Sequence, residues 1–573
     1  MNRFRPFILV VAVVLSALLA YGLFTLPSPV PSDVEGFSAA RVVKDIEVMS
    51  KEHHSVAHPV EREAVRNYLI GRLEGLGADT MQVFRYDSLV GPKNKHVEYT
   101  FDAYDILAEF APLKASDDTV FLMMVAHYDS RYSQPFAKDT VWSYGAADDG
   151  YGVGVILETV SNLLKEREQW NQGVKVLFSD AEEVGMMGMK AIWENDRHVF
   201  DNVGFMMNVE ARGPWGPALL FEACPGNSKV MDLYASAAKY PYTYSLTTVV
   251  YNFMPNFTDF TIVKDSIPGL NFSTIADANR YHTHLDNFGN ISEKSIQHYG
   301  AQILPVASEY LKSEEFSDKY ALRSDKDMTN FTVPLLGLFN FSKTGYIIFN
   351  IVVVLLFLLV FGLEGIRGRI KAVKVFRNSV IVLGSALGVL LVGEVIAYLC
   401  ALVAGVTFKP FGIMQGIMFD NAAMIASIAV LALVCVMIYL AGRRKAMRAV
   451  SGSMRASAPV TAATQYAYNS LYGTLALIFV LNVALLLAVG ENLMFLIPLL
   501  CASVAMILYH LTGLRFWFPV AVVLVLLHAF SFLYALAMAL TIGALGAVMM
   551  FAFIDIMVLI PLSDLYMMPS RKK

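Results

Sequence analysis

The chain has 573 residues, more than one ordinary domain holds, so we expect at least two domains. Hydrophobic residues make up 56% of the sequence, which excludes a wholly soluble protein. The formal net charge is -4 and no basic patch is interleaved with aromatic residues, so we expect no nucleic-acid partner. Of the four cysteines only Cys224 falls in the soluble-looking half, which excludes an intradomain disulfide or a cysteine zinc site there.

The apolar residues are unevenly distributed along the chain. Residues 33–325 are an ordinary soluble mixture of charged residues, turns and short apolar runs, whereas long uncharged stretches alternate with short basic loops from residue 345 onward. We therefore expect an N-terminal membrane anchor (1–32), a soluble domain (33–325), a linker (326–344) and a helical membrane domain (345–573).

The first apolar run covers residues 7–24 and is about long enough to span a membrane, with Arg3 and Arg5 before it. A cleaved signal peptide is the alternative interpretation. We favour an anchor because the run is long for a signal core and no clear small-x-small cleavage site follows it. Either interpretation predicts that the soluble domain is exported.

The next informative run, residues 119–125, is apolar and rich in β-branched residues and methionine, which predicts a buried strand. It ends in the motif AHYDS, residues 126–130. A histidine at the carboxyl end of a strand lies where open α/β sheets place their ligands. Asp129 could hydrogen-bond to His127 and fix its tautomer. Taken alone, a His-x-Asp pair is more often incidental.

Two acidic motifs follow. The first, GAADDGYG (145–152), opens a helical pattern, and crowding Asp148 against Asp149 is costly without a cation; an N-cap role explains only one of the two acids. The second, SDAEEVG (179–185), follows a predicted strand. There one glutamate can bind a metal while its neighbour takes a proton from water. A solvated acidic turn explains this second motif alone equally well.

Two further motifs complete the series. A predicted strand at 203–209 continues into NVEARG (208–213), and YHTHLDN (281–287) follows another apolar run. Each of the five motifs ends a strand or opens a loop and carries an oxygen or imidazole ligand. Two histidines with three carboxylates form the mixed nitrogen and oxygen set that suits a pair of Zn²⁺ ions.

Seven more apolar stretches follow, near residues 345–363, 379–405, 421–441, 470–490, 493–511, 518–536 and 539–562. With the N-terminus inside, the basic segments at 367–377, 443–448, 515 and 571–573 all fall on the cytoplasmic side. We therefore expect an integral membrane protein with eight spans, cytoplasmic termini and membrane lipids as partners. The soluble domain would lie outside the cytoplasm, in a periplasm or an organelle lumen. One kinked segment in place of the last two spans is the alternative.

Some ionisable residues have no assigned role. Glu394, His528 and Asp555 fall within predicted spans, where such groups are costly and indicate either a functional site or a structural polar network. Asp259 and Tyr281, in the soluble domain, would either line a substrate cleft or pack in the core. The residues do not decide between these roles.

The series AHYDS, GAADDGYG, SDAEEVG, NVEARG and YHTHLDN resembles the co-catalytic zinc peptidase family of aminopeptidase Y, glutamate carboxypeptidase II and the glutaminyl cyclases. Order and spacing agree over about residues 40–312. The architecture of anchor, exported peptidase and multi-span region is similar to the endoplasmic-reticulum metallopeptidase branch. The resemblance implies an α/β fold with a mixed, mainly parallel central sheet flanked by helices, the zinc exopeptidase fold, followed by an all-α membrane domain.

The resemblance also implies roles for particular residues. His127 and Glu210 would hold one zinc ion, Glu183 and His282 would hold a second, and Asp148 would bridge the two. Glu182 would be the general base. Asp129, which could orient His127, is the second expected catalytic residue. The family places a cis peptide after its bridging aspartate, so the bond from Asp148 to Asp149 is expected to be cis.

Two departures leave questions open. Many aminopeptidases of the family have aspartate where this chain has Glu210, so the preference for amino- or carboxy-terminal residues is not fixed. His284 is an alternative ligand, but His282 keeps the family register relative to Asp286.

The expected function is hydrolysis of peptides, most simply by an aminopeptidase that needs zinc and no further cofactor. A glutaminyl cyclase-like acyltransferase is one alternative, although those relatives use one zinc ion and this chain retains all five ligands. A receptor or scaffold on the same fold is another, and loss of ligands would mark it.

Overall fold

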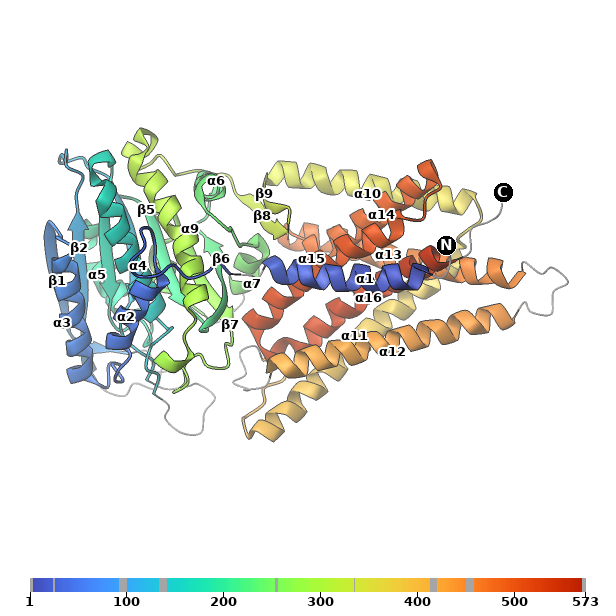
Figure 1. Cartoon of the computed structure of the whole chain (residues 1–573), viewed down its shortest axis with the longest axis horizontal. Coiled ribbons are helices and arrows are strands. Elements are labelled where there is room, and N and C mark those ends of the chain that lie inside the picture. Colours follow the sequence, from blue (N-terminus) through green and yellow to red (C-terminus); the bar gives the residue numbers. More distant parts are fainter. Residues whose placement is uncertain are drawn as a thin grey trace. The chain divides into compact units, whose positions relative to one another are not determined.

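The computed structural model describes residues 4–23, 26–91, 100–132, 142–252, 256–333, 335–412, 420–449 and 458–568. The chain divides into two compact units. The α/β unit comprises Phe24–Thr332 and Leu336–Lys343, and the helical unit comprises Met1–Leu23, Val333–Leu335 and Thr344–Lys573. Figure 1 shows both units and labels most of their helices and strands.

A mixed sheet forms the centre of the α/β unit (Figure 1). Its strands are β1 (Thr80–Val90), β2 (Thr100–Phe110), β3 (Phe121–His127), β4 (Gly173–Ser179), β5 (Val203–Ala211), β6 (Trp215–Ala223) and β7 (Gly269–Ala276). Among the described residues the strand order is β1-β2-β4-β3-β5-β7-β6. Strands β4, β3, β5 and β7 are parallel, and β1, β2 and β6 join antiparallel at the sides. The expected mixed, mainly parallel sheet is confirmed.

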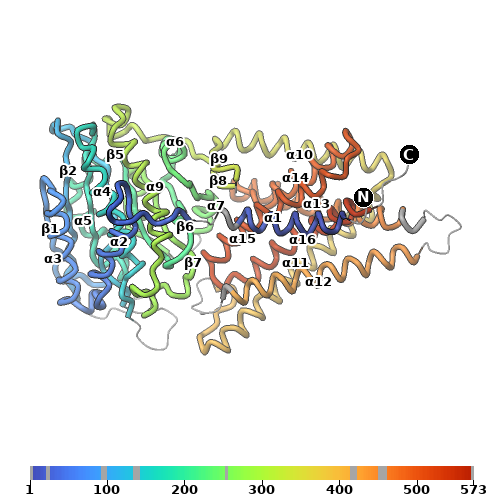
Figure 2. Tube along the Cα trace, in the orientation of Figure 1, coloured from blue at the N-terminus to red at the C-terminus, as the bar shows by residue number. Residues whose placement is uncertain are grey.

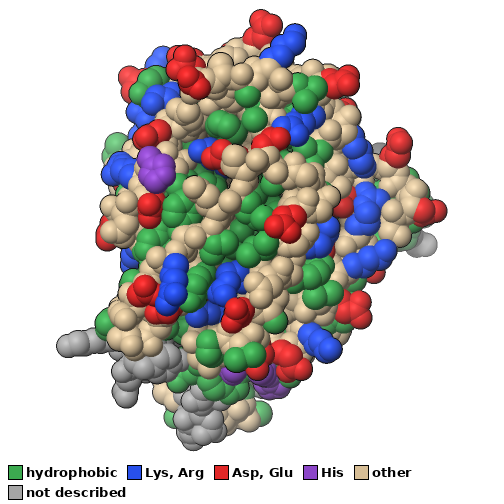
Figure 3. Space-filling model, turned by 90° about the vertical axis from the view of Figure 1, so that its left-hand side faces the viewer, with side chains coloured by type: hydrophobic (Ala, Val, Ile, Leu, Met, Phe, Trp, Pro, Cys, Tyr) green, Lys and Arg blue, Asp and Glu red, His purple; other side chains and the backbone are tan. Residues whose placement is uncertain are grey.

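The apolar runs of the sequence became the parallel centre of this sheet. Every residue of β3, β4, β5 and β7 is buried, as expected for parallel strands covered on both faces. By contrast, no residue of the edge strand β1 is buried. The face that carries β1 and α3 has basic and acidic side chains intermixed around apolar ones (Figure 3). Because β4, β3, β5 and β7 are parallel, their carboxyl ends meet at one edge of the sheet, where ligands bind in such sheets.

Helices flank the sheet: α2 (Ala39–Met49), α3 (Pro59–Gly75), α4 (Gly150–Leu163), α5 (Met187–Asn195), α6 (Ser228–Ala237), α7 (Ser245–Asn252), α8 (Asp259–Val263) and α9 (Glu293–Lys312). Helix α4 packs on β3 and β5, α9 packs on β3 and β6, and α5 packs on β1 and β2. Helix α4 is buried almost throughout, because α2 and α9 cover it on the side away from the strands. The core lies between these helices and the sheet.

Two short strands lie within residues 326–344, the segment expected to be a linker. β8 (Met328–Val333) and β9 (Gly337–Ser342) pair with each other. The backbone N–H of Thr332 donates to the oxygen of Thr243 at 2.9 Å, so β8 is attached to the α/β unit.

The helical unit contains α1 (Arg5–Leu23), α10 (Lys343–Ile366), α11 (Ala372–Ala404), α12 (Asp420–Arg448), α13 (Ala458–Val489), α14 (Leu493–Thr512), α15 (Trp517–Leu540) and α16 (Leu545–Met567). In the described part of the chain, seven of these helices, α10 to α16, are long and apolar enough to cross a membrane. They coincide with the seven expected stretches, and α15 and α16 are separate helices. The chain is an integral membrane protein.

Helix α1 lies along α15 although 507 residues separate their contacting atoms in sequence (Figure 2). The hydroxyl of Ser16 donates to the backbone oxygen of Val523 at 3.5 Å, and the Arg5 guanidinium donates to the backbone oxygen of Tyr566 at 3.1 Å. The apolar part of α1 that is fully described, Arg5–Ala20, is shorter than the seven long helices. Arg3 and the basic segment 571–573 of the topology prediction lie outside the described residues.

Candidate metal centre

His127 is the last residue of β3 and is 1% exposed. Its Nδ1–H donates to the backbone oxygen of Asp129 at 2.9 Å, which leaves Nε2 as the available lone pair. The carboxylate of Asp129 is farther from Nδ1, at 3.5 Å. The expected fixing of the imidazole thus comes first from the carbonyl of Asp129 rather than from its carboxylate.

The Asp129 carboxylate instead holds the loop after β4. Its Oδ1 accepts from the backbone N–H of Glu182 at 2.9 Å, and its Oδ2 accepts from that of Glu183 at 3.3 Å. The start of the same loop is fixed by Asp180, whose carboxylate pairs with the Arg62 guanidinium at 3.1 Å in the interior. Both glutamates therefore project from a backbone anchored at each side.

The loop before α4 carries Asp148. The Asp286 carboxylate accepts from the backbone N–H of Ala147 at 2.7 Å and from the hydroxyl of Ser143 at 3.0 Å. Asp149 caps α4 by accepting from the backbone N–H of Gly152 at 3.0 Å, as the N-cap interpretation predicted. The peptide bond between Asp148 and Asp149 is cis, as the resemblance implied.

The other two candidate ligands, Glu210 and His282, come from β5 and from the segment after β7. Glu210 stands near the end of β5, where its Oε1 accepts from the Asn208 amide at 3.1 Å. His282 follows β7 in the left-handed region, with φ of 58°, and its ring stacks on that of Tyr281 with centroids 3.5 Å apart. His284 is exposed and is not part of the cluster, whereas His282 faces the other candidate ligands.

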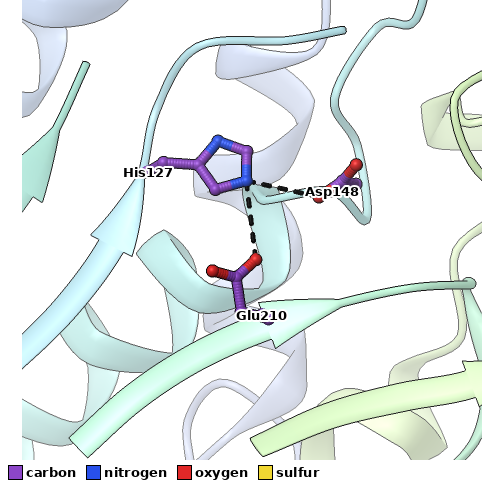
Figure 4. Close-up of side chains that lie close together, drawn as sticks. All are labelled: His127, Asp148 and Glu210. Atoms are coloured by element: carbon purple, nitrogen blue, oxygen red, sulfur yellow. Dashed lines mark hydrogen bonds and ion pairs between the residues drawn. The ribbon is translucent and has the colours of Figure 1, made fainter. Parts of the chain in front are cut away.

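These side chains form two groups that share Asp148. In the first, His127 Nε2 lies 3.3 Å from Oδ1 of Asp148 and 3.6 Å from Oε2 of Glu210 (Figure 4). In the second, His282 Nε2 lies 3.2 Å from Oδ2 of Asp148 and 3.1 Å from Oε1 of Glu183. Within each group the candidate ligand atoms lie within 4.8 Å of one another. All five expected ligands converge, with one carboxylate placed between the two groups.

The electrostatics of the cluster call for a cation. Burial raises the pKa of Asp148 well above its usual range, and the nearby charge of Glu183 raises it further. Burial raises the pKa of Glu182 as well. Oδ2 of Asp148 and Oε1 of Glu183 are buried and accept no hydrogen bond from the described residues. Buried carboxylate oxygens that accept no hydrogen bond are costly, so imidazole nitrogens and carboxylate oxygens in this arrangement fit metal ions of the Zn²⁺ type.

Sequence reasoning missed Arg131, which immediately follows the AHYDS motif. Its guanidinium donates to Oε2 of Glu183 at 3.1 Å and also contacts the Glu183 backbone oxygen. Burial alone would raise the pKa of Glu183, but His282 and Arg131 lower it well below the usual range. The only signal for this role in the sequence was adjacency to the histidine motif, which does not identify a partner 52 residues away.

Asp259, left between cleft and core, is 1% exposed at the start of α8 and contacts the Ser179 hydroxyl, which donates to it. Burial raises its pKa to about 7. Tyr281 is partly exposed and belongs to the site through its stacking on His282.

Comparison with known proteins agrees with this geometry. Residues 106–307 match Peptidase family M28. Endoplasmic reticulum metallopeptidase 1 of Mus musculus is 28% identical over 267 residues, which cover 45% of this chain and 28% of that protein. The vacuolar membrane protease of Candida dubliniensis is 28% identical over 284 residues, which cover 46% of this chain and 28% of that protein. The matched segments thus span less than a third of either relative.

Among solved structures, a Zn-dependent exopeptidase from Parabacteroides distasonis has a TM-score of 0.38 and 18% identity. The match covers 48% of this chain and 99% of that chain. The family match includes β3 to β5 and β7, together with all five residues of the ligand cluster. Residues 106–307 of the α/β unit are therefore similar to peptidase family M28, and the chain continues from that unit into the helical membrane unit.

Proposed function

We propose that this chain is a membrane-anchored, zinc-dependent exopeptidase that removes amino-terminal residues from peptides. The observation that carries the proposal is the pair of ligand groups that share Asp148. The family match and the names of the metallopeptidase relatives support the same chemistry. The domain limits that we propose are 1–32 for the anchor, 33–325 for the peptidase, 326–344 for the linker and 345–573 for the membrane domain.

Two zinc ions would be held by this chain. His127 Nε2, Glu210 Oε2 and Asp148 Oδ1 would bind one, and Asp148 Oδ2, Glu183 Oε1 and His282 Nε2 would bind the other. When bound, zinc lowers the pKa of a water molecule and polarises a carbonyl group. Asp129 would keep His127 in the correct tautomer and hold the loop that carries Glu182.

Glu182 would serve as the general base. Its backbone is fixed by Asp129, while its partly exposed side chain belongs to neither ligand group. The carboxylate can therefore take a proton from the attacking water and pass it to the amine of the leaving peptide. A neighbouring glutamate that is already paired with Arg131 could not do this, which separates the roles of Glu182 and Glu183.

We also propose that the peptidase domain lies outside the cytoplasm, with α1 as an eighth span and both termini inside. The basic segments after the second and fourth spans support this orientation under the positive-inside rule. Membrane lipids would surround α10 to α16, on which many apolar side chains are exposed.

Metal reconstitution tests the proposed function. The detergent-solubilised chain would be stripped with a chelator, dialysed, and supplied with defined amounts of zinc while hydrolysis of unblocked peptides is followed by liberated amino acids. We expect activity to saturate at two zinc ions per chain and blocked amino termini to abolish cleavage. Saturation at one zinc ion would point to the acyltransferase alternative. Absence of zinc binding would contradict the enzyme proposal and leave the receptor alternative.

A further inference from the structure

One arginine next to the ligand cluster has no assigned role. Arg212 directly follows the last residue of β5, two positions beyond Glu210. Its backbone N–H donates to the oxygen of Thr274 at 2.9 Å and to the hydroxyl of Ser273 at 3.0 Å, both on β7. At the next position, a Cβ on Gly213 would lie 2.2 Å from the backbone oxygen of Ala276, so only glycine allows the two segments to approach this closely. The backbone that carries the Arg212 side chain is therefore held in place against β7.

Arg212 is partly exposed, and its guanidinium lacks the ion-pair partners that two buried arginines of this unit have. Arg62 pairs with Asp180 and Arg131 pairs with Glu183. In Arg212 the Nε and Nη2 atoms are buried and donate to no acceptor among the described residues. Leaving buried N–H donors unpaired costs free energy, and more so for a charged group. The side chain is thus prepared for an acceptor that the described residues do not supply.

Among the described residues, no carboxylate offsets the Arg212 charge. Burial lowers the pKa of Arg212, and only the hydroxyls of Tyr281 and Tyr251 act in the opposite direction. Those two tyrosines also border the ligand cluster: Tyr281 lies within electrostatic range of Asp148 and both glutamates of the loop. Tyr251 lies within range of Glu210 and Glu182. The same tyrosines therefore border the unpaired cation and the proposed catalytic groups.

We propose that Arg212 binds a carboxylate of the peptide substrate and so makes this site selective for acidic ligands. This inference rests on the proposed function and deepens it. The planar guanidinium matches a carboxylate in a two-point contact, which would satisfy both unpaired donors at once. Two sources supply the same chemistry: the free carboxyl terminus of a short peptide, or an aspartate or glutamate side chain.

Binding to an inactive variant tests the inference. The full-length Glu182→Gln protein, loaded with zinc in detergent, retains the proposed ligands and would bind peptides without cleaving them. Calorimetry would compare alanyl-alanine with alanyl-alaninamide, and glutamyl-alaninamide with glutaminyl-alaninamide. We expect the carboxylate member of one pair to bind about 10- to 100-fold more tightly, the strength of a charged hydrogen-bonded contact. A preference in the first pair identifies the carboxyl terminus, and one in the second identifies a side chain.

Three further variants, each combined with Glu182→Gln, assign the preference to Arg212. Arg212→Gln should abolish it, and Arg212→Lys should leave an intermediate preference because the charge remains but the two-point geometry is lost. Arg280→Gln is the matched control, since the Arg280 guanidinium already pairs with Asp277 at 3.6 Å, and it should leave the preference unchanged. Should Arg212→Gln fail to fold, Arg212→Lys decides the question alone.

The outcomes separate this inference from the proposed function. Equal binding within both pairs, or a preference that survives in both Arg212 variants, would overturn the carboxylate role. If the wild-type protein still hydrolyses alanyl-alaninamide in that case, the exopeptidase proposal stands without it. If zinc-loaded protein binds none of the four peptides, the inference and the proposed function both fail.

Discussion

The Oδ1 atom of Asp129 lies 2.9 Å from the backbone nitrogen of Glu182, and this hydrogen bond connects the end of β3 to the loop after β4. One carboxylate therefore positions the proposed base, while its own backbone oxygen orients the imidazole of His127. The proposed catalytic groups on neighbouring strands are thus held together by a residue that would not itself bind zinc.

Replacing Asp129 with asparagine should reduce activity without unfolding the domain. The NH₂ group of the introduced amide would face the backbone N–H of Glu183 or Glu182, so one of the two anchoring hydrogen bonds is lost. We expect a 10- to 100-fold loss in kcat or in zinc affinity, the range found for residues that orient metal ligands. Steady-state kinetics with counted zinc measure it. Unchanged kcat and zinc affinity would show that Asp129 does not position the site.

Substituting Gly152 should destabilise the start of α4. A Cβ there would lie 2.3 Å from Oδ2 of Asp149 and 2.4 Å from the backbone oxygen of Val209, so Gly152→Ala forces the cap and β5 apart. We expect a loss of about 1–3 kcal/mol in the free energy of unfolding. Denaturant unfolding followed by tryptophan fluorescence measures it.

Gly71 provides the control for that experiment, because it lies within α3 and a Cβ there meets nothing within 4 Å. Gly71→Ala should raise the stability by about 0.5–1 kcal/mol, since alanine favours the helix. Equal effects of the two substitutions would contradict the close approach of α4 and β5.

Removing the buried partner of Asp180 should be more costly. The ion pair between Arg62 and Asp180 is 4% and 0% exposed, so Arg62→Met leaves an unpaired charge in the interior. We expect a destabilisation of about 3–5 kcal/mol in the same unfolding assay. Arg85→Gln removes an arginine whose pair with Asp87 is 58% and 62% exposed, and should cost less than about 1 kcal/mol. A small effect of Arg62→Met would mean that water reaches Asp180.

The α/β unit should lose stability in mild acid through His298. Burial lowers the pKa of His298 to about 4, and its Nδ1 accepts from the backbone N–H of Ala218 at 2.9 Å. An unfolded histidine takes up a proton below a pH of about 6.5, so between about 6.5 and 4 the unfolded state binds more protons. Stability therefore falls as the pH drops through this window.

The variant His298→Gln separates this contribution from those of other groups. It should be less stable at neutral pH, because it loses the ring's hydrogen bonds to the backbones of Ala218 and Tyr240. Its free energy of unfolding should, however, change less between neutral pH and a pH of about 4. Unfolding free energies measured at several pH values give the two slopes. Parallel slopes in variant and wild type would show that His298 titrates normally.

The sequence allowed the central strands and the ligands to be predicted because both follow local patterns. The fully apolar runs became β3, β4, β5 and β7, and four of the five motifs lie at or after the carboxyl end of one of these strands. The antiparallel strands at the sides were not predicted, since β1 is largely exposed and has no such run. Partners distant in sequence were also hidden: Ser143 and Asp286 are 143 residues apart, and their hydrogen bond depends on the tertiary fold.

The arginines show the same limit. Arg131 follows one ligand motif and Arg212 lies within another. Only the fold reveals that Arg131 pairs with Glu183, whereas two donors of Arg212 are buried without acceptors among the described residues. In the sequence the two residues carry the same charge and both lie within a few positions of a candidate ligand. The two guanidinium groups differ in their partners because the tertiary fold places different segments beside them.

The most direct test of the central claim is hydrolysis by Glu182→Gln with bound zinc counted in the same samples. Glutamine is nearly isosteric but cannot accept the proton, so peptide hydrolysis should fall by about 100-fold or more while two zinc ions per chain remain. Glu194→Gln, which changes an exposed glutamate on α5, should match the wild type. Wild-type rates in Glu182→Gln would contradict the account, because the proton would then be taken by another group.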